Sequence, residues 1–129
     1  MQAATQPYER ETRSVPFQVR LTWLSHAPVI SVNIDAVAAR RRVSGWSGAV
    51  ATSCGAGSPE LVIEQTRVFW RVPVVFTRQG FGVVGEIGSV DLDAQTGQMA
   101  VNDELVKTMQ ANAIEMAAKL ADIQSISHA

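Results

Sequence analysis

The segment 60–101 constrains the fold most strongly, because it consists of short apolar runs separated by turn-forming residues. Turns are predicted at 78–82, where glycine is frequent, and at 93–97, where an aspartate and a glycine favour a tight reversal. Between these turns apolar and polar residues alternate, as they do in strands with one buried face. The spacing predicts an antiparallel β-meander of about four strands.

The longest predicted strand, 68–77, has apolar residues on both faces. One face carries Trp70, Val72, Val74 and Phe76, and the other carries Phe69, Arg71, Pro73, Val75 and Thr77. A strand of this kind is typically covered on both sides, so we expect it to be covered by helices or by a second subunit.

Three residues in the meander predict departures from regular pairing. Pro73 has no amide hydrogen, so we expect an edge or a bulge at its position. Gly85 and Gly88 lie in the next strand, where glycine indicates a bulge or the close approach of another part of the chain.

Amphipathic segments on either side of the meander predict two helices that cover it. The first is expected over about 35–53, with Asn33 or Asp35 as N-cap, and is ended by two glycines and a proline in 55–59. Its expected apolar positions are Ile34, Val37, Ala38, Trp46, Ala49, Val50 and Cys54. The second is expected over about 103–123, with an apolar stripe of Leu105, Met109, Ala113, Met116, Leu120 and Ile123, widened by Val106, Ala117 and Ala121.

A further strand is predicted from Val15 onward, because Phe17, Val19, Leu21 and Trp23 alternate with polar residues. The whole pattern therefore predicts a single α+β domain over 15–123. Residues 1–14 are expected to form a flexible arm, and residues 124–129 a frayed tail.

The composition limits the classes of function. Charged residues make up only 18% of the chain, against about 25% in a typical globular protein, and this favours self-association. A formal net charge of −1 gives no overall field that would attract nucleic acid or an anionic membrane. The single cysteine excludes an intrachain disulfide and a zinc-binding spacing. With no signal-peptide pattern and no long apolar run, a soluble cytoplasmic protein is expected.

The order of a helix, strands rich in valine and aromatic residues, and a strand ending in Asp93, Ala94, Thr96 and Gly97 resembles the PepSY domain over about 35–101. In that family a helix packs on an antiparallel sheet, and one strand typically ends in an Asp-Ala-x-Thr-Gly turn. PepSY domains are mostly extracytoplasmic and are often linked to inhibiting or chaperoning peptidases. The resemblance implies the arrangement of elements and, as a second alternative for function, a peptidase regulator.

Two motifs suggest phosphate or nucleic-acid binding, but their context favours simpler interpretations. Gly80, Gly82 and Gly85 spell G-x-G-x-x-G, but a strand-like sequence follows where a nucleotide-binding motif requires a helix. We interpret these glycines as belonging to a hairpin and its bulges. The run 40–42 is three arginines on a predicted helix, where consecutive side chains spread over about 200°, so it indicates a solvated face.

The candidate reactive groups do not form a catalytic constellation. Cys54 is expected at the C-terminal end of the first helix, where the helix dipole disfavours a thiolate. His26 lies in a loop and His128 in the tail, so neither has a partner at a useful spacing. Glu64, Glu86, Asp91 and Asp93 lie on neighbouring strands; Asp91 and Asp93 share a face, and Glu86 has the opposite parity. We predict no catalytic residue, no cofactor and no metal site.

The leading hypothesis is a non-catalytic, homo-oligomerising interaction or scaffold module, most simply a homodimer. The alternative is a small-molecule-binding or enzymatic pocket between a curved sheet and a helix. The two hypotheses differ in whether Glu86, His26 or Arg71 points into an enclosed cavity. The interface or pocket candidates are Trp23, Trp46, Trp70, Arg71, Glu86, Met109 and Met116.

Overall fold

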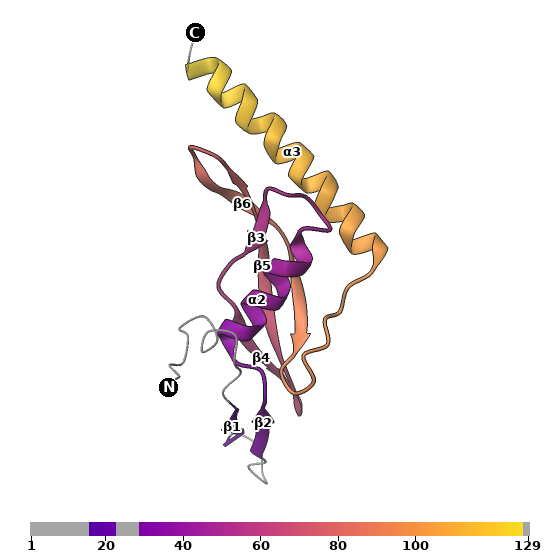
Figure 1. The fold of residues 1–129 in the computed structure, drawn as a ribbon. Coiled ribbons are helices and arrows are strands. Elements are labelled where there is room, and N and C mark those ends of the chain that lie inside the picture. Colours follow the sequence, from indigo (N-terminus) through magenta and orange to yellow (C-terminus); the bar gives the residue numbers. More distant parts are fainter. Residues whose placement is uncertain (1–15, 23–28, 128–129) are drawn as a thin grey trace, which may run out of the picture.

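The computed structural model describes residues 16–22 and 29–127, and it confirms the predicted α+β class (Figure 1). The helices are α2 (Ala36–Ser47) and α3 (Asp103–Ser127). The strands are β1 (Phe17–Arg20), β2 (Val29–Val32), β3 (Cys54–Ala56), β4 (Glu60–Glu64), β5 (Arg67–Arg78) and β6 (Gly82–Asp93).

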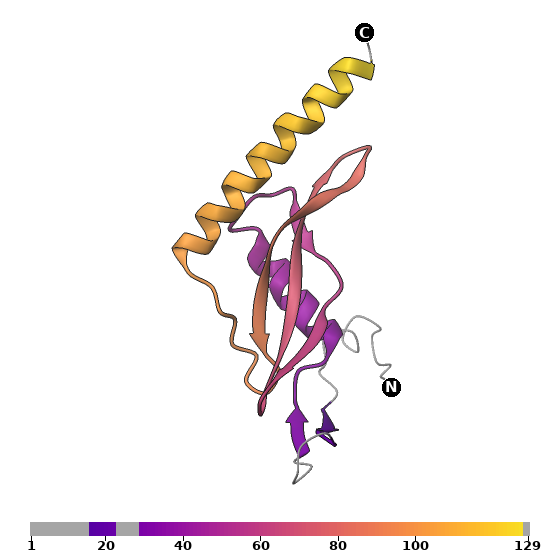
Figure 2. The same ribbon diagram turned by 180° about the vertical axis from the view of Figure 1, so that it is seen from behind.

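The main sheet is organised around the long strand β5. β6 pairs antiparallel along one edge of β5, while β4 and β3 pair with successive parts of the other edge. Figure 2, which views the molecule from behind, shows β4 and β6 on opposite sides of β5. The predicted up-and-down arrangement is therefore confirmed for β4, β5 and β6. The predicted strand at 99–101 is reduced to a single bridge between Leu92 and Met99.

Pro73 lies where the edge formed by β3 and β4 is interrupted. Its carbonyl accepts a hydrogen bond from Gly57 N at 2.8 Å, and Gly57 lies between the two short strands. In an antiparallel strand the N–H and C=O of one residue point to the same edge, so the missing donor of Pro73 faces this interruption. A side chain on Gly57 would lie 2.9 Å from Pro73 Cγ, so the chain passes close to the proline ring here. The predicted irregularity at Pro73 is confirmed.

One face of β5 belongs to the hydrophobic core, as the alternation predicts. Trp70, Val72, Val74 and Phe76 are all buried, and they pack in one cluster with residues of α2, β6 and α3. The Asp35 side chain caps α2 by accepting a hydrogen bond from Ala38 N at 2.9 Å, which confirms the predicted start of this helix. Asn102 caps α3 in the same way, accepting from Leu105 N at 2.8 Å.

The predicted first helix is too long, because α2 ends at Ser47 rather than near residue 53. The Ser47 side chain is fully buried, and its hydroxyl donates to Ser44 O at 2.7 Å and Cys54 O at 3.2 Å. These bonds join the helix end to β3, which begins at Cys54. Within α2 the apolar face is also rotated from its predicted position: Val37 is 52% exposed, whereas Val43 is fully buried.

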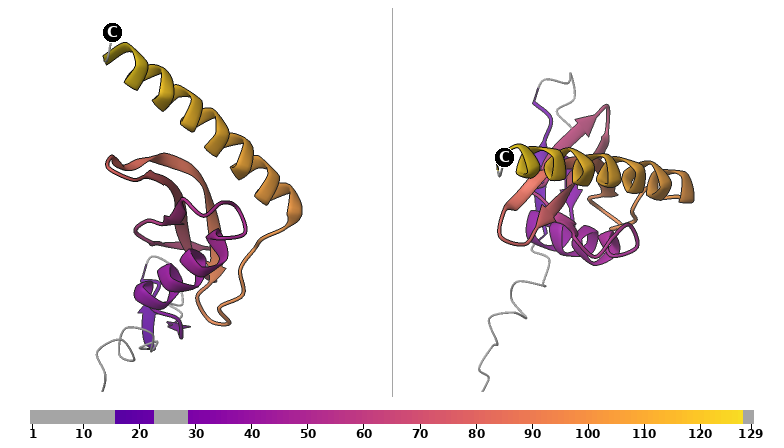
Figure 3. Two further views of the ribbon diagram at one scale, coloured as in Figure 1. Left: turned by 45° about the horizontal axis from the view of Figure 1, so that its top comes forward. Right: turned by 90° about the horizontal axis from the view of Figure 1, so that it is seen from above.

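One further boundary differs from the prediction, and the predicted N-terminal strand is present as β1. α3 continues to Ser127 rather than ending near Ile123, so residues 124–127 are helical instead of forming a frayed tail. β1 pairs with β2 in a separate two-stranded sheet and does not join the main one. The two views of Figure 3 show α3 as a long rod whose C-terminal part extends in the same direction as the hairpin between β5 and β6.

Candidate functional site

Four of the predicted pocket residues pack within the core or against it. Trp70 is buried, and its indole N–H donates to Ile34 O at 2.6 Å. Met109 is also buried, while Trp46 and Met116 are half-buried and pack against the same cluster. Trp70 and Met109 therefore fill the space between sheet and helices where the pocket hypothesis places a ligand. Trp23, His26 and His128 lie outside the described residues.

The glycines of β6 allow α3 to approach the sheet closely, as predicted. A Cβ on Gly88 would lie 2.8 Å from Met109 Cε, and a Cβ on Gly85 would lie 2.9 Å from Met116 Cε. Between these contacts the Asn112 amide donates to Ile87 O at 2.9 Å. Together with the positive φ angles of Gly80 and Gly82 at the hairpin, these contacts account for the G-x-G-x-x-G sequence.

The opposite, outer face of the sheet carries the charged candidates. Arg71 forms two hydrogen bonds with the Asp91 carboxylate, at 3.0 and 3.3 Å. The hydrogen bond and the charge of Asp91 raise the pKa of Arg71, so this guanidinium stays ionised. Glu86 pairs in register with Val75 and is exposed. Both Arg71 and Glu86 face solvent, so neither points into an enclosed cavity.

The predicted parity of Glu86 is wrong. The strand register shifts between Val74 and Val75, so that Val74 pairs with Gly88 and Val75 pairs with Glu86. This bulge adds one residue to β6 and moves Glu86 to the face that carries Asp91. A bulge was predicted at Gly88 and is present there. Its effect on the direction of the Glu86 side chain could not be predicted, because the sequence does not show how β5 and β6 are aligned.

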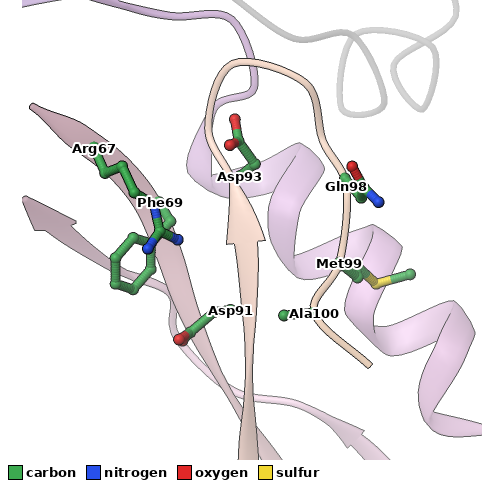
Figure 4. Close-up of a pocket in the computed structure, with 7 residues that line it drawn as sticks. All are labelled: Arg67, Phe69, Asp91, Asp93, Gln98, Met99 and Ala100. Atoms are coloured by element: carbon green, nitrogen blue, oxygen red, sulfur yellow. The ribbon is translucent and has the colours of Figure 1, made fainter. Parts of the chain in front are cut away.

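A shallow pocket of about 210 Å³ lies on this outer face, beside the end of β6 (Figure 4). Its floor includes Phe69, which is only 2% exposed because the guanidinium groups of Arg67 and Arg71 lie 5.1 and 5.4 Å from the centre of its ring. Such cation–π contacts hold the two long side chains across the ring. The full lining is Arg67, Phe69, Asp91, Asp93, Gln98, Met99 and Ala100.

The two carboxylates in this pocket have structural partners. Asp91 is bonded to Arg71, and Asp93 Oδ1 accepts from Gln95 N at 2.8 Å and Thr96 N at 3.0 Å. The two hydrogen bonds accepted by Asp93 form the predicted 93–97 turn, which Gly97 completes with a φ of 79°. In the described part of the chain, no group of three or more His, Cys, Asp or Glu residues could hold a metal ion. The pocket offers a surface for contact rather than an acid–base pair.

The other reactive candidates are occupied in packing. Cys54 begins β3 instead of ending a helix, so its predicted position is wrong, and partial burial raises the pKa of its thiol. Arg40 donates to Ala56 O at 3.2 Å and Arg42 donates to Gly97 O at 3.4 Å. These two arginines reach β3 and the 93–97 turn respectively, which agrees with the prediction that residues 40–42 form no single basic stripe.

A groove with a volume of about 370 Å³ lies beside α3 and was not predicted from the sequence. Ile114 at its rim is 71% exposed and lies about 100° round the helix from the buried Ala113 of the apolar stripe. The lining is Val50, Ala51, Phe76, Arg78, Gln110, Ala113, Ile114 and Ala117. An isoleucine displaced from the centre of an amphipathic stripe was the available signal in the sequence.

Other exposed hydrophobic side chains lie on the β5–β6 hairpin and on α3. Phe81 and Val83, on the β5–β6 hairpin, are 56% and 61% exposed, and Ile123 of α3 is 62% exposed. Figures 1 and 3 show the hairpin and the C-terminal part of α3 extending toward the same end of the molecule. We refer to Phe81, Val83, Ile114 and Ile123 as the apolar end.

Among the described residues no helix has both the length and the hydropathy needed to cross a membrane. The resemblance to PepSY domains stays a prediction. Comparison with protein-family models, with curated proteins and with solved structures gives no match to this chain.

Proposed function

We propose that this protein is a non-catalytic interaction module that forms a homodimer through its apolar end. The observation that carries the proposal is the exposure of Ile114 and Ile123 on α3, at 71% and 62%. Both belong to a helix whose Leu105, Met109 and Met116 pack on the domain, so α3 has more apolar surface than the sheet covers. Single exposed hydrophobic residues are common on monomers, whereas several such side chains on one part of a protein mark an association site. Ile114 and Ile123 are nine residues apart and leave α3 on opposite sides, so each would contact a different part of the partner.

The distribution of exposed residues supports this choice of surface. Among the described residues, the exposed large hydrophobics are Phe17, Val29, Val37, Phe81, Val83, Ile114 and Ile123, and four of these seven form the apolar end. A second copy is the simplest partner, because a two-fold axis places the same patch on both sides of the interface. The low charged fraction of 18% gives this surface few groups that would oppose such contact.

Sedimentation velocity at micromolar concentration tests the proposal with two matched variants. Ile114→Arg places a charge in the proposed interface and should convert the dimer to a monomer. Val37→Arg introduces the same side chain at a position that is 52% exposed on α2, and it should leave the dimer intact. Circular dichroism should show both variants folded, since both positions face solvent. A monomeric wild-type protein, or equal dissociation of the two variants, would contradict the proposal.

A further inference from the structure

Among the residues that the structure describes, the outer edge of β4 has backbone groups without hydrogen-bond partners. Val68 O accepts a hydrogen bond from Ala94 N beyond β6, whereas Pro73 O accepts from Gly57 N on the β3 and β4 side. In this part of β5, the backbone N–H and C=O groups of even-numbered residues therefore point toward β6. Those of odd-numbered residues point toward β4. Phe69 is odd-numbered and pairs with Val62, so the backbone N–H and C=O groups of Val62 form hydrogen bonds with β5.

Leu61 and Ile63 alternate with Val62, so their N–H and C=O groups point away from the sheet. Within the described part of the chain no hydrogen bond satisfies these four groups. Unpaired edges of this kind are templates for an added strand. The free edge therefore spans the whole of β4, whose bounds are Glu60 and Glu64.

The side chains of β4 specify the chemistry of a strand that would fit there. Glu60 and Glu64 are exposed on the outer face. Their charges help to raise the pKa of Arg71, but no salt bridge to either carboxylate forms among the described residues. Leu61 and Ile63 are half-buried on the inner face, where they extend the core. An added strand would therefore need basic residues opposite the two glutamates and apolar residues opposite Leu61 and Ile63.

The same pattern disfavours a second copy of β4. Antiparallel self-pairing about Val62 would place Glu60 of each copy opposite Glu64 of the other, and directly opposed like charges destabilise a sheet. We propose that β4 binds an extended basic segment of a partner protein by strand addition. This surface is separate from the apolar end, so the inference does not depend on the proposed homodimer.

The probe is a capped peptide with the core sequence Lys-Val-Thr-Val-Lys, flanked by glycines. Aligned antiparallel to β4, its lysines oppose Glu60 and Glu64, and its valines oppose Leu61 and Ile63. Two control peptides isolate the two parts of the interaction. In one, glutamate replaces both lysines; in the other, N-methylation of both valines removes the backbone donors that would face β4.

Two measurements test binding: titration calorimetry, and hydrogen exchange of single amides by NMR. Saturating probe should slow exchange of the Leu61 and Ile63 amides, while the N-methylated and glutamate peptides should bind at least about tenfold more weakly. The double variant E60K/E64K should lose affinity for the probe by a similar factor. The variant E86K/E104K changes net charge equally at two exposed positions outside β4 and should bind as the wild type does.

Three results would overturn the inference. The first is unchanged exchange at Leu61 and Ile63 under saturating probe. The second is equal binding of the N-methylated peptide, because the backbone would then play no part. The third is protection of these two amides in the free protein that rises with protein concentration, which would assign the edge to a second copy. Sedimentation of E60K/E64K keeps the two proposals distinct, since the homodimer should survive this change.

Discussion

Met109 of α3 occupies the space that a side chain at Gly88 of β6 would need, with its Cε only 2.8 Å from the position of such a Cβ. Met116 has the same relationship to Gly85, at 2.9 Å. These two contacts, with the Asn112 amide between them, fix how α3 lies across β6. The orientation of α3 in turn determines which of its residues form the apolar end.

Gly88→Ala should destabilise the protein, because Met109 is fully buried and has Cγ as well as Cε within 3.0 Å of the added methyl. Overpacking of this kind costs about 1–3 kcal/mol, measured as a lower midpoint in urea unfolding. Gly45→Ala is the matched control, since no atom lies within 4 Å of the added methyl and the site is inside α2. This control should gain up to about 1 kcal/mol. Equal effects at the two sites would contradict the packing described here.

Trp70→Phe should destabilise the protein by about 1–3 kcal/mol, because it leaves the buried Ile34 carbonyl without the 2.6 Å hydrogen bond from the indole. Trp46→Phe is the comparison: Trp46 is half-buried, and no hydrogen bond of its side chain is present among the described residues. This second change should cost less than about 1.5 kcal/mol. Thermal unfolding followed by circular dichroism measures the stability of both variants. A larger loss of stability for Trp46→Phe would contradict the stabilising role of the Trp70–Ile34 hydrogen bond.

Stability should decline at alkaline pH through Cys54. Burial raises the pKa of its thiol in the folded protein above the unfolded value of about 8.5. The folded state therefore holds the proton more tightly; this stabilising contribution is complete below the unfolded pKa and is lost as pH rises through the folded pKa. Urea unfolding of the wild type and of Cys54→Ser across this range should differ in slope, with the variant less sensitive to pH. Parallel slopes would show that the thiol titrates alike in both states.

The thermal midpoint should rise with protein concentration, because dimerisation of the folded state adds a stabilising term that depends on concentration. Calorimetric midpoints measured over a roughly hundredfold range of protein concentration would detect this trend. Ile114→Arg should abolish the trend while leaving a cooperative transition. A midpoint independent of concentration in the wild type would count against the homodimer.

Local chemistry in the sequence was sufficient to predict the meander, the capping of α2 by Asp35 and the roles of Pro73 and Gly88. Each of these depends on one residue type with a fixed backbone preference, or on strict alternation over several residues. The Asp93 turn is predictable for the same reason, since its side chain bonds to amides two and three residues further along the chain.

The remaining features depend on contacts between distant residues. The end of α2 is set by Ser47, whose hydroxyl bonds to Cys54 across the following loop, and nothing in the helical periodicity marks that position. Glu86 changes face because of the register shift opposite Val75. The groove beside Ile114 depends on how α3 crosses the sheet, so the spacing along the helix identifies the residue without identifying its neighbours.

The interruption opposite Pro73 also divides one side of the sheet into two units that can respond separately. Hydrogen bonds from Ser47 and Arg40 connect β3 to α2, whereas within residues 16–22 and 29–127 the backbone of β4 pairs only with β5. A ligand strand seated on Leu61 and Ile63 would thus extend only the part of this edge that β4 forms, and β3, beyond the interruption, would gain no new hydrogen bonds. The proposed dimer contact uses other residues, so one protomer would have room for a second copy and a strand ligand at the same time.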